Sequence, residues 1–478
     1  MSELPTNYGI QYVASELSSW KEKAPRNLQT LGIKFVRLQW VDLVNNIRYR
    51  VIPVKHFLKM LSSDPRPSVC LTKASMGLVF INLAEGFGAA GEYLYVADMD
   101  SLRVCPYAPG HASVMGWFEE KNKIVGRDGL ETLQAELCPR TMVRRVEQEA
   151  KQLFGIDFLL GFEIEFILLK STDPIEAVNY HGWSNSPALP TGAVETMVLE
   201  EIADSLDAAG IELQMYHAEA APGQYEVVTG PLSPLESCDA LIFTRETIFN
   251  IASKYGLRAT LAPRVYNNNC GSGAHIHFSL HTPQPPSLPD SPSTSLTPLE
   301  ASFLSTILDS LPALCALTLP TAPSYSRVID GVWSGGTYVS YGIDNRESPV
   351  RICGTSSSRH FEMKCLDGTA NPYLAIAGIL GAGLEGVKNK SKLEILECSD
   401  HPAALLSEEE RKVRGVTARL PSSIQQAREW LGGEEGATIR KVLGDNVVEK
   451  YISVNKTLEQ AFGEGTEAEI MKRIVENY

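Results

Sequence analysis

Two carboxylates, Glu163 and Glu165, stand two positions apart in the apolar segment GFEIEF. In a β-strand, residues i and i+2 point to the same face, so both carboxylates share one face and their apolar neighbours share the other. Taken alone, such a pair indicates a strand with one wet face. Leu and Ile residues flank this pair at both odd and even positions, so they point to both faces, which is typical of a strand buried on both faces. Two ionised carboxylates at such a place cost several kcal/mol each unless a cation offsets them.

Three later segments supply further groups that could act with this pair. A single histidine on a strand is usually a hydrogen-bonded core residue, but two on one face favour a ligand role. The additional candidates are His275, His277 and Ser279 in GAHIHFS, Glu219 and Glu226 across the Pro-Gly turn of HAEAAPGQYE, and Glu362 beside Lys364 in RHFEMK.

Five glutamates and a histidine on separate strands form a ligand set for hard divalent cations. Oxygen-rich ligation favours Mg²⁺ or Mn²⁺, whereas zinc sites more often use Cys and His. The number of carboxylates indicates two or more ions, as in phosphoryl-transfer sites, where metals neutralise a polyphosphate. A bicupin, with one metal held by HxH and a glutamate, is the alternative, and it leaves most of the glutamates unexplained.

Cationic residues gather in the stretch around the last of these glutamates, at Arg327, Arg346, Arg351 and Arg359. Arg346 and Arg351 could clamp a phosphate or a carboxylate, which suits the fork of a guanidinium group. The chain has neither a GxxxxGK[ST] nor a GxGxxG motif, so no glycine cradle indicates a nucleotide. The residues therefore predict a multi-metal, anion-binding site for phosphoryl transfer.

The surrounding sequence predicts an α+β protein with an antiparallel sheet. Residues 33–109 read as short strands broken by turns, and helices are predicted over 139–155, 194–210 and 241–255, each ending at or near a glycine. Strand candidates such as DFLLGFEIEFILL, QYEVV and GAHIHFSL alternate loosely with these helices. The Pro/Ser-rich stretch 281–298 is predicted to be an exposed loop.

Composition excludes several classes of partner. The 478 residues carry a net charge of −14, so a DNA or RNA backbone or an anionic membrane finds no broad basic surface. Residues 1–15 lack the features of a signal peptide, and no stretch reaches the roughly 18 to 20 apolar residues of a bilayer span. The nine cysteines include no CxxC pair, which fits reduced thiols. We expect a cytoplasmic protein with no nucleic-acid or membrane partner.

Six motifs carry a resemblance that covers the chain from about residue 33 onward. In order they are GFEIEF, HAEAAPGQYE, GSGAHIHFS, SYSR, DNRESPVR and FEMKCLDGTANPYLAIAGIL. They resemble the glutamine synthetase family, specifically its type I branch and the glutamine-synthetase-like proteins of fungi and bacteria. The resemblance implies an N-terminal extension (1–30), a β-grasp domain (31–115) and a catalytic domain (116–478) that carries a metal-lined antiparallel sheet, as in the glutamine synthetase and guanidino kinase folds.

The resemblance also implies roles for individual residues. One Mg²⁺ or Mn²⁺ ion would be held by Glu165, Glu219 and Glu226, and the ion on the ATP phosphates by Glu163, His275 and Glu362. Arg327 would grip the amino-acid carboxylate beside Cys270 and Gly271, and Arg346 would stabilise the transferring phosphoryl group. Contacts to ATP would come from Arg351, Ser279, Lys364 and His277. Asp42 would reach a neighbouring subunit's site as the amine-binding carboxylate, which implies a homo-oligomeric ring, a dodecamer of two stacked hexamers.

Three positions depart from the family pattern. Trp333 stands where the family has a flap glutamate that closes over ammonium, Cys270 replaces an asparagine, and Lys364 replaces an arginine. A large aromatic ring beside an amine site suits an organic amine, through apolar contact or cation–π attraction. We therefore expect an ATP-dependent ligase that forms a γ-amide of glutamate through an acyl phosphate, with an organic amine favoured over ammonia.

Other readings remain open at this point. The first is ordinary glutamine synthesis from glutamate and ammonia. The second is an inactive structural or signalling relative that keeps the ring, although all six metal-ligand positions are filled and Asp42 is present. The third is a phosphotransferase of the guanidino kinase type, which shares the fold and a two-metal site.

Overall fold

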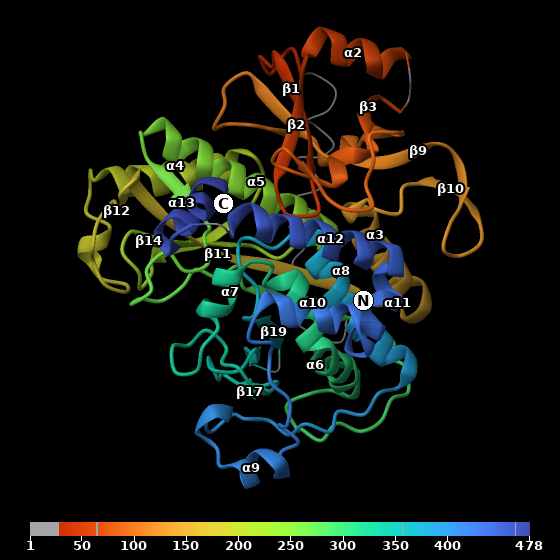
Figure 1. Cartoon of the computed structure of the whole chain (residues 1–478), viewed down its shortest axis with the longest axis vertical. Coiled ribbons are helices and arrows are strands. Elements are labelled where there is room, and N and C mark those ends of the chain that lie inside the picture. Colours follow the sequence, from red (N-terminus) through yellow and green to blue (C-terminus); the bar gives the residue numbers. More distant parts are fainter. Residues whose placement is uncertain (1–27, 64–65, 356, 464) are drawn as a thin grey trace, which may run out of the picture.

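The computed structural model describes residues 28–63, 66–355, 357–463 and 465–478 (Figure 1). Most of the predicted N-terminal extension lies outside these residues. The strands nearest the N-terminus form two four-stranded sheets. One has the order β2 (Ile47–Pro53), β1 (Phe35–Val41), β8 (His111–Val114), β7 (Arg103–Val104), and the other has the order β10 (Glu131–Gln134), β9 (Gly116–Val125), β6 (Glu92–Ala97), β3 (Ser68–Thr72).

Helix α2 (Val54–Ser63) follows β2 and lies with β1 and β2 at one end of the molecule, drawn in red in Figure 1. Strand β9 begins at Gly116 and pairs with β6, so the N-terminal sheet runs on past residue 115, where a domain boundary was predicted. That boundary stays a prediction.

A larger sheet forms the centre of the remaining chain. Its order is β13 (Leu213–Ala218), β14 (Gln224–Thr229), β11 (Asp157–Thr172), β16 (Ile276–His281), β19 (His360–Met363), β18 (Val350–Cys353), β17 (Tyr341–Ile343), with β12 (Ile175–Ala177) and β15 (Arg258–Thr260) also paired to β11. Among the described residues its pairings are antiparallel except that β17 and β18 are parallel. The predicted α+β class is confirmed. The sheet was predicted to be antiparallel, and it is mixed at the edge formed by β17 and β18.

The predicted helices are present with small shifts in their ends. Helix α3 (Pro139–Phe154) starts with a proline in its first turn and ends at Gly155, whose φ of 62° is the left-handed conformation that glycine adopts without strain. Helix α4 (Val194–Ala208) agrees with its prediction. Helix α5 (Pro234–Lys254) begins seven residues earlier than predicted, because Pro234 starts the helix before its apolar stripe begins. The stretch 282–297 is irregular as predicted, although Ser293 and Leu296 are buried.

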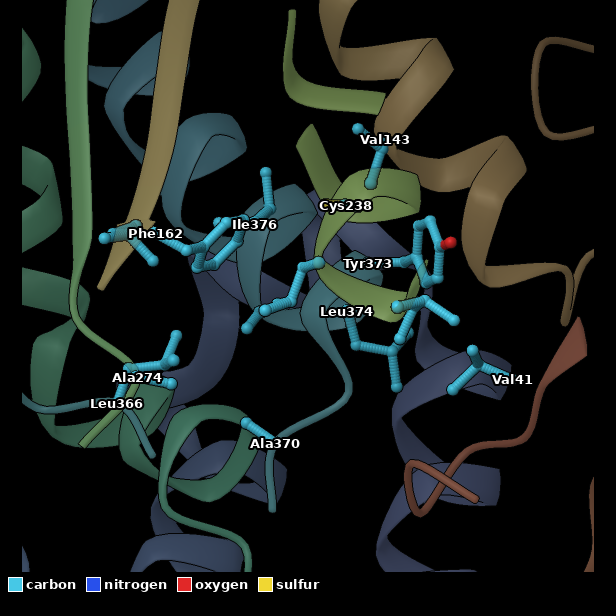
Figure 2. Packing of buried hydrophobic residues seen from close by; sticks show 14 of the residues in the cluster. Val41, Val143, Phe162, Cys238, Ala274, Leu366, Ala370, Tyr373, Leu374 and Ile376 are labelled. Carbon is cyan, nitrogen blue, oxygen red and sulfur yellow. The ribbon is translucent and has the colours of Figure 1, made fainter. Parts of the chain in front are cut away.

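Interior helices pack under the central sheet. Helix α6 (Pro298–Thr318) packs along α8 (Pro372–Asn389), and both are buried almost throughout. Helix α6 is long and apolar enough to cross a membrane, but 89% of that window is buried inside the fold. Figure 2 shows how Val143 of α3, Phe162 of β11 and Tyr373 of α8 meet in one core, with Val41 from β1 at its edge. The remaining helices are α7 (Ala322–Arg327), α9 (Glu408–Val413), α10 (Ile424–Gly432), α11 (Ala437–Leu443), α12 (Asp445–Phe462) and α13 (Glu467–Asn477).

Arg140 joins the N-terminal sheets to the helices of the larger part. Its guanidinium group is buried and pairs with Asp98 at 2.8 Å and with Asp239 of α5 at 2.6 Å. Asp239 also accepts a hydrogen bond from the Tyr373 hydroxyl. A cation held by two carboxylates in this way cannot be removed without leaving buried negative charge unpaired.

We therefore expect Arg140→Met to lower the free energy of unfolding by about 3 kcal/mol or more. The matched control is Lys151→Met on the same helix, where the ion pair to Asp157 is exposed on both sides. That control should change stability by no more than about 1 kcal/mol. Urea unfolding followed by circular dichroism measures both, and equal shifts for the two variants would contradict the buried-pair argument.

Candidate active site

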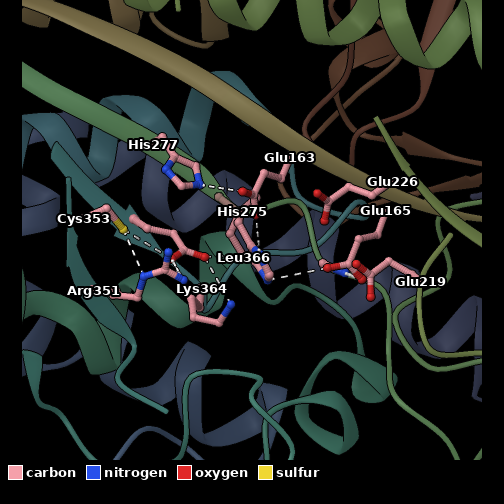
Figure 3. A network of polar contacts seen from close by, with 12 residues as sticks. Glu163, Glu165, Glu219, Glu226, His275, His277, Arg351, Cys353, Lys364 and Leu366 are labelled. Carbon is pink, nitrogen blue, oxygen red and sulfur yellow. Dashed lines mark hydrogen bonds and ion pairs between the residues drawn. The ribbon is translucent and has the colours of Figure 1, made fainter. Parts of the chain in front are cut away.

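The register of the central sheet places acidic side chains of neighbouring strands side by side. Glu165 of β11 stands opposite Glu226 of β14, which in turn stands opposite His217 of β13. Glu219 comes directly after β13. We call these four residues the carboxylate cluster, and Figure 3 shows its three glutamates converging.

Close contacts link the members of the carboxylate cluster. His217 Nδ1 lies 3.3 Å from Glu219 Oε1, and its Nε2 lies 3.1 Å from Glu226 Oε1. Glu165 Oε2 accepts hydrogen bonds from the Gln224 side chain at 3.0 Å and from the Gly273 amide at 2.9 Å. The carboxylates are therefore oriented by fixed donors from neighbouring segments.

Burial and mutual repulsion make this cluster hold protons. Burial, followed by the charges of Glu226 and Glu219, raises the pKa of Glu165 to about 8. Burial and then Glu226 raise the pKa of Glu219 to about 7, and burial also raises the pKa of Glu226. The hydrogen bond to Glu226 raises the pKa of His217 to about 9. Crowded carboxylates of this kind are stabilised in their charged form by a bound cation.

A second group lies on the same face of the sheet, toward β16 and β19, which follow β11 in the direction away from β14. His277 of β16 stands opposite Glu362 of β19, and His277 Nε2 lies 3.0 Å from Glu163 Oε1. His275, just before β16, places Nδ1 3.1 Å from Glu163 and 3.6 Å from Glu362. We call Glu163, Glu362, His275 and His277 the histidine cluster (Figure 3).

Nearby cations neutralise the carboxylates of the histidine cluster. Lys364 Nζ lies 3.1 Å from one oxygen of Glu362, and Arg351 lies 2.8 Å from the other. Burial acts to raise the pKa of Glu362, but Lys364 and the histidines hold it at about 2. Burial likewise opposes ionisation of Glu163, and hydrogen bonds from His275 and His277 outweigh it and lower its pKa.

His275 lies between the two clusters. Burial and the Lys364 charge lower its pKa to about 4, so the ring is neutral, the form that ligates metals. Its Nε2 is buried, makes no hydrogen bond to any described residue, and lies 3.9 Å from Glu165 Oε1. A side chain at Gly273 would place Cβ 2.5 Å from this nitrogen and 3.3 Å from Glu165, so glycine keeps the space open. These residues fit divalent cations held by oxygen and imidazole ligands.

Both clusters open into one cavity of about 850 Å³, which we call the main cavity. It brings together most of the residues that the sequence singled out: Glu163, Glu165, Glu219, Glu226, Cys270, Gly271, His275, Arg327, Trp333, Arg346 and Lys364. Arg346 is exposed, and among the described residues no acidic side chain is paired with it. Its charge is therefore free to meet an anion in the cavity.

Arg327 is the buried guanidinium group of this cavity. One of its terminal nitrogens donates to the carbonyls of Lys364 at 2.7 Å and Leu366 at 3.0 Å, while its Nε has no partner among the described residues. Gly271 packs against it, because a Cβ there would lie 2.4 Å from Arg327 Cγ. This close approach places the backbone of the GSG motif directly beside the cation.

An aromatic pair stands at the opening of the main cavity. Trp333 lies in the loop 328–340 with φ at 58°, and the carboxylate of Glu347 accepts hydrogen bonds from its amide and from the amide of Gly331. Trp183, from a loop distant in sequence, meets it edge to face with ring centroids 6.2 Å apart. Both rings line the cavity and are more than half exposed. The opening therefore offers two aromatic surfaces.

A second hollow of about 230 Å³, the side cavity, adjoins the main one through Glu163, Met215 and Val228. His277 and Ser279 line it, together with residues of β11 and β14. The residues predicted to contact ATP are thus divided between the two cavities and the ion pairs around Glu362.

Comparison with known proteins identifies this arrangement. Residues 136–472 match the glutamine synthetase catalytic domain. The chain belongs to the glutamine synthetase family. Its relatives include protein fluG of Emericella nidulans, 36% identical over 94% of this chain, and type-1 glutamine synthetase 1 of Dictyostelium discoideum, 31% identical over 75% of this chain and 74% of that protein. The chain spans about half (49%) of the length of fluG.

Other similarities concern one further relative and the fold. Gamma-glutamylpolyamine synthetase GlnA3 of Streptomyces coelicolor is 30% identical over 76% of each chain. Among solved structures, a GmaS/ADP complex superposes with a TM-score of 0.77 at 22% identity, covering 93% of this chain and 97% of that one. Ligand-free GmaS gives the same TM-score. The glutamine synthetase fold is therefore confirmed.

Asp42 is a predicted site residue that lines neither cavity. Its side chain is buried in the turn between β1 and β2, where it accepts hydrogen bonds from the amides of Val44 and Asn46 and pairs with Arg48 at 2.8 Å. Burial raises its pKa, and Arg48 opposes this. In this chain the carboxylate organises a turn, and its predicted role in a neighbouring glutamine synthetase subunit stays a prediction.

Sequence reasoning missed two residues of the site. His217 belongs to the quoted segment HAEAAPGQYE, and its i, i+2 spacing from Glu219 on a strand would have placed both on one face. Trp183 gave no such signal, because it lies in a loop 150 positions from Trp333 and only the fold brings them together.

We expect Glu226→Gln to weaken Mn²⁺ binding about tenfold or more, because Glu226 stands opposite Glu165 in the sheet and its ligand atom lies within 4.8 Å of those of Glu219 and His217. Binding must displace protons from Glu165 and Glu219, so the affinity of the unaltered protein should rise as the pH increases from about 6 to about 9. Electron paramagnetic resonance of free Mn²⁺ measures both effects. Glu176→Gln, on exposed β12, is the control, and identical titrations for the two variants would contradict the assignment.

Proposed function

We propose that this chain is an ATP-dependent ligase that joins an amine to the γ-carboxylate of glutamate, with an organic amine favoured over ammonia. The observation that carries this proposal is the convergence of two cation-binding clusters and two arginines, Arg327 and Arg346, on one cavity. Membership of the glutamine synthetase family supports the reaction class. The name of GlnA3, a gamma-glutamylpolyamine synthetase, supports an organic amine as one option within that class.

The two clusters would hold Mg²⁺ or Mn²⁺. Glu165, Glu219 and Glu226 suit one ion, and Glu163, His275 and Glu362 suit the other, with His217 and His277 beside them. When bound, such ions neutralise the charge of phosphate oxygens during phosphoryl transfer. The chain's own contribution is to keep the ligands close and to hold His275 neutral between the clusters.

The arginines would handle the anionic groups of the substrates. A carboxylate is a poor electrophile, so the γ-carboxylate oxygen of glutamate first bonds to the γ-phosphorus of ATP, and ADP leaves. Arg346, which has no acidic partner among the described residues, would stabilise the charge on the transferring group. Arg327 would bind the amino-acid carboxylate beside Gly271 and Cys270. ATP contacts are assigned to His277 and Ser279 in the side cavity and to Arg351 and Lys364 beside Glu362.

The second step would bring the amine to the acyl phosphate. Its nitrogen attacks the acyl carbon, the bond to phosphate breaks, and inorganic phosphate leaves with a γ-amide as the product. The amine loses a proton in this step. Trp333 and Trp183 at the opening supply ring faces for cation–π contact and apolar surface for carbon chains, which suit an organic amine better than ammonium. The homo-oligomeric ring and the cytoplasmic location remain predictions.

Phosphate release tests the proposal directly. The full chain is assayed with Mg²⁺, ATP and glutamate, against ammonia, a polyamine, ethanolamine and an aromatic monoamine. We expect turnover with at least one organic amine to exceed turnover with ammonia. Trp333→Glu should shift the ratio of kcat/KM for that amine over ammonia toward ammonia by about fivefold, since cation–π contacts contribute about 1 kcal/mol.

Trp183→Ala should shift the same ratio in the same direction. Tyr180→Ala is the matched control, because Tyr180 is an exposed aromatic three positions away that does not line the cavity. Preference for ammonia in the unaltered chain would identify ordinary glutamine synthesis, and absence of turnover across the panel would favour an inactive relative. Phosphate transfer to a guanidino compound without amide formation would indicate a phosphotransferase of the guanidino kinase type.

A further inference from the structure

A second set of metal-ligating side chains, with a thiol and two imidazoles, extends from His277 at the edge of the histidine cluster. His277, Cys353 and His360 each offer one ligand atom, and these atoms all lie within 4.8 Å of one another. The sheet brings them together: Cys353 of β18 stands opposite His360 of β19, and β19 pairs with β16, which carries His277. The two imidazole rings have centroids 5.1 Å apart.

We propose that His277, Cys353 and His360 form a site for a zinc-class divalent ion, which shares His277 with the histidine cluster and differs from the magnesium-type sites in its ligand chemistry. Thiolate and imidazole ligands select Zn²⁺ over Mg²⁺, which prefers oxygen. Three protein ligands leave a fourth tetrahedral position open to water or to a ligand group. The same short stretch of sheet thus carries two ligand sets of different chemistry.

Neighbouring groups prepare two of these ligands. Arg351 Nε donates a hydrogen bond to Cys353 Sγ at 3.0 Å, which favours the thiolate form. Burial and the Glu362 charge outweigh it and raise the pKa of the Cys353 thiol to about 12, so a bound metal must displace the thiol proton. His360 Nδ1 lies 2.8 Å from the carbonyl oxygen of Ser358, which can only accept. Nδ1 therefore carries the proton and leaves Nε2 of His360 as the ligand atom.

The site can be reached from the side cavity. His277 and His360 line that cavity, and Cys353 is buried beside them. Glu362 lies 3.8 Å from the Cys353 sulfur, so its negative charge offsets part of the charge of a bound cation. Because His277 is also assigned to ATP, an ion at this site would compete with the nucleotide; this consequence rests on the proposed function, whereas the binding itself does not.

Cobalt spectroscopy on the full chain tests the binding without nucleotide, glutamate or amine. Co²⁺ bound by a thiolate gives a charge-transfer band in the near ultraviolet. We expect one such ion per chain, displaced by Zn²⁺ and unaffected by excess Mg²⁺. Cys353→Ser should abolish the band, and His360→Gln should weaken Co²⁺ binding about tenfold or more.

Cys70→Ser is the matched control, because Cys70 is exposed and lies in a different sheet. It should leave the band unchanged. A thermal melt of each metal-free variant shows that it is folded, and His360→Gln, whose residue is only partly buried, provides a second variant if Cys353→Ser is unstable. Absence of a thiolate band in the unaltered chain, or a band that persists in Cys353→Ser, overturns the proposal. Neither result depends on whether the chain is a ligase.

Discussion

The architecture of the site depends on one constraint: the chain places ionisable glutamates on a strand whose other face is part of the core. Phe162, Ile164 and Phe166 are fully buried on one side of β11, so Glu163 and Glu165 must lie on the other. Carboxylates removed from water need partners or a cation. Strands on both sides of β11 supply partners: histidines come from β13 and β16, and basic side chains come from β18 and from the residue after β19.

The features of this arrangement that could be predicted are those that follow from the spacing of apolar and charged residues within one segment. The i, i+2 spacing of Glu163 and Glu165 gave both their strand and their common face, and apolar stripes ending in glycine gave α3 and α4. The residue types of later segments indicated the companion residues Glu219, Glu226, His275 and Glu362, and the family resemblance then assigned them to two ions. The structure places all four around β11, because their strands are its direct or next neighbours.

What the sequence could not supply is the pairing between distant segments. Trp183 meets Trp333 only because two loops fold over the same cavity, and no periodic pattern records that approach. The approach of Cys353 and His360 to His277 depends on the register of three strands. Asp42 is a case in which a motif position implied a role between subunits. Within this chain its carboxylate is bound by the amides of Val44 and Asn46 and by Arg48, which the motif did not indicate.

The two clusters also differ in how far the protein alone neutralises them. Around Glu362 and Glu163, Lys364 and Arg351 supply positive charge, and both carboxylates are ionised without any ion. Within the described part of the chain, His217 is the one cationic side chain in an ion pair with the glutamates of the carboxylate cluster, while Arg327 and Lys364 act on them without such a pair. Burial and the mutual repulsion of three glutamates therefore raise the pKa values of Glu165 and Glu219. A cation therefore changes the protonation of the carboxylate cluster far more than that of the histidine cluster. His275 lies 3.1 Å from Glu163 in the histidine cluster and 3.9 Å from Glu165 in the carboxylate cluster, so the two clusters are close neighbours. A cation bound in either cluster would therefore favour the charged form of the carboxylates in the other.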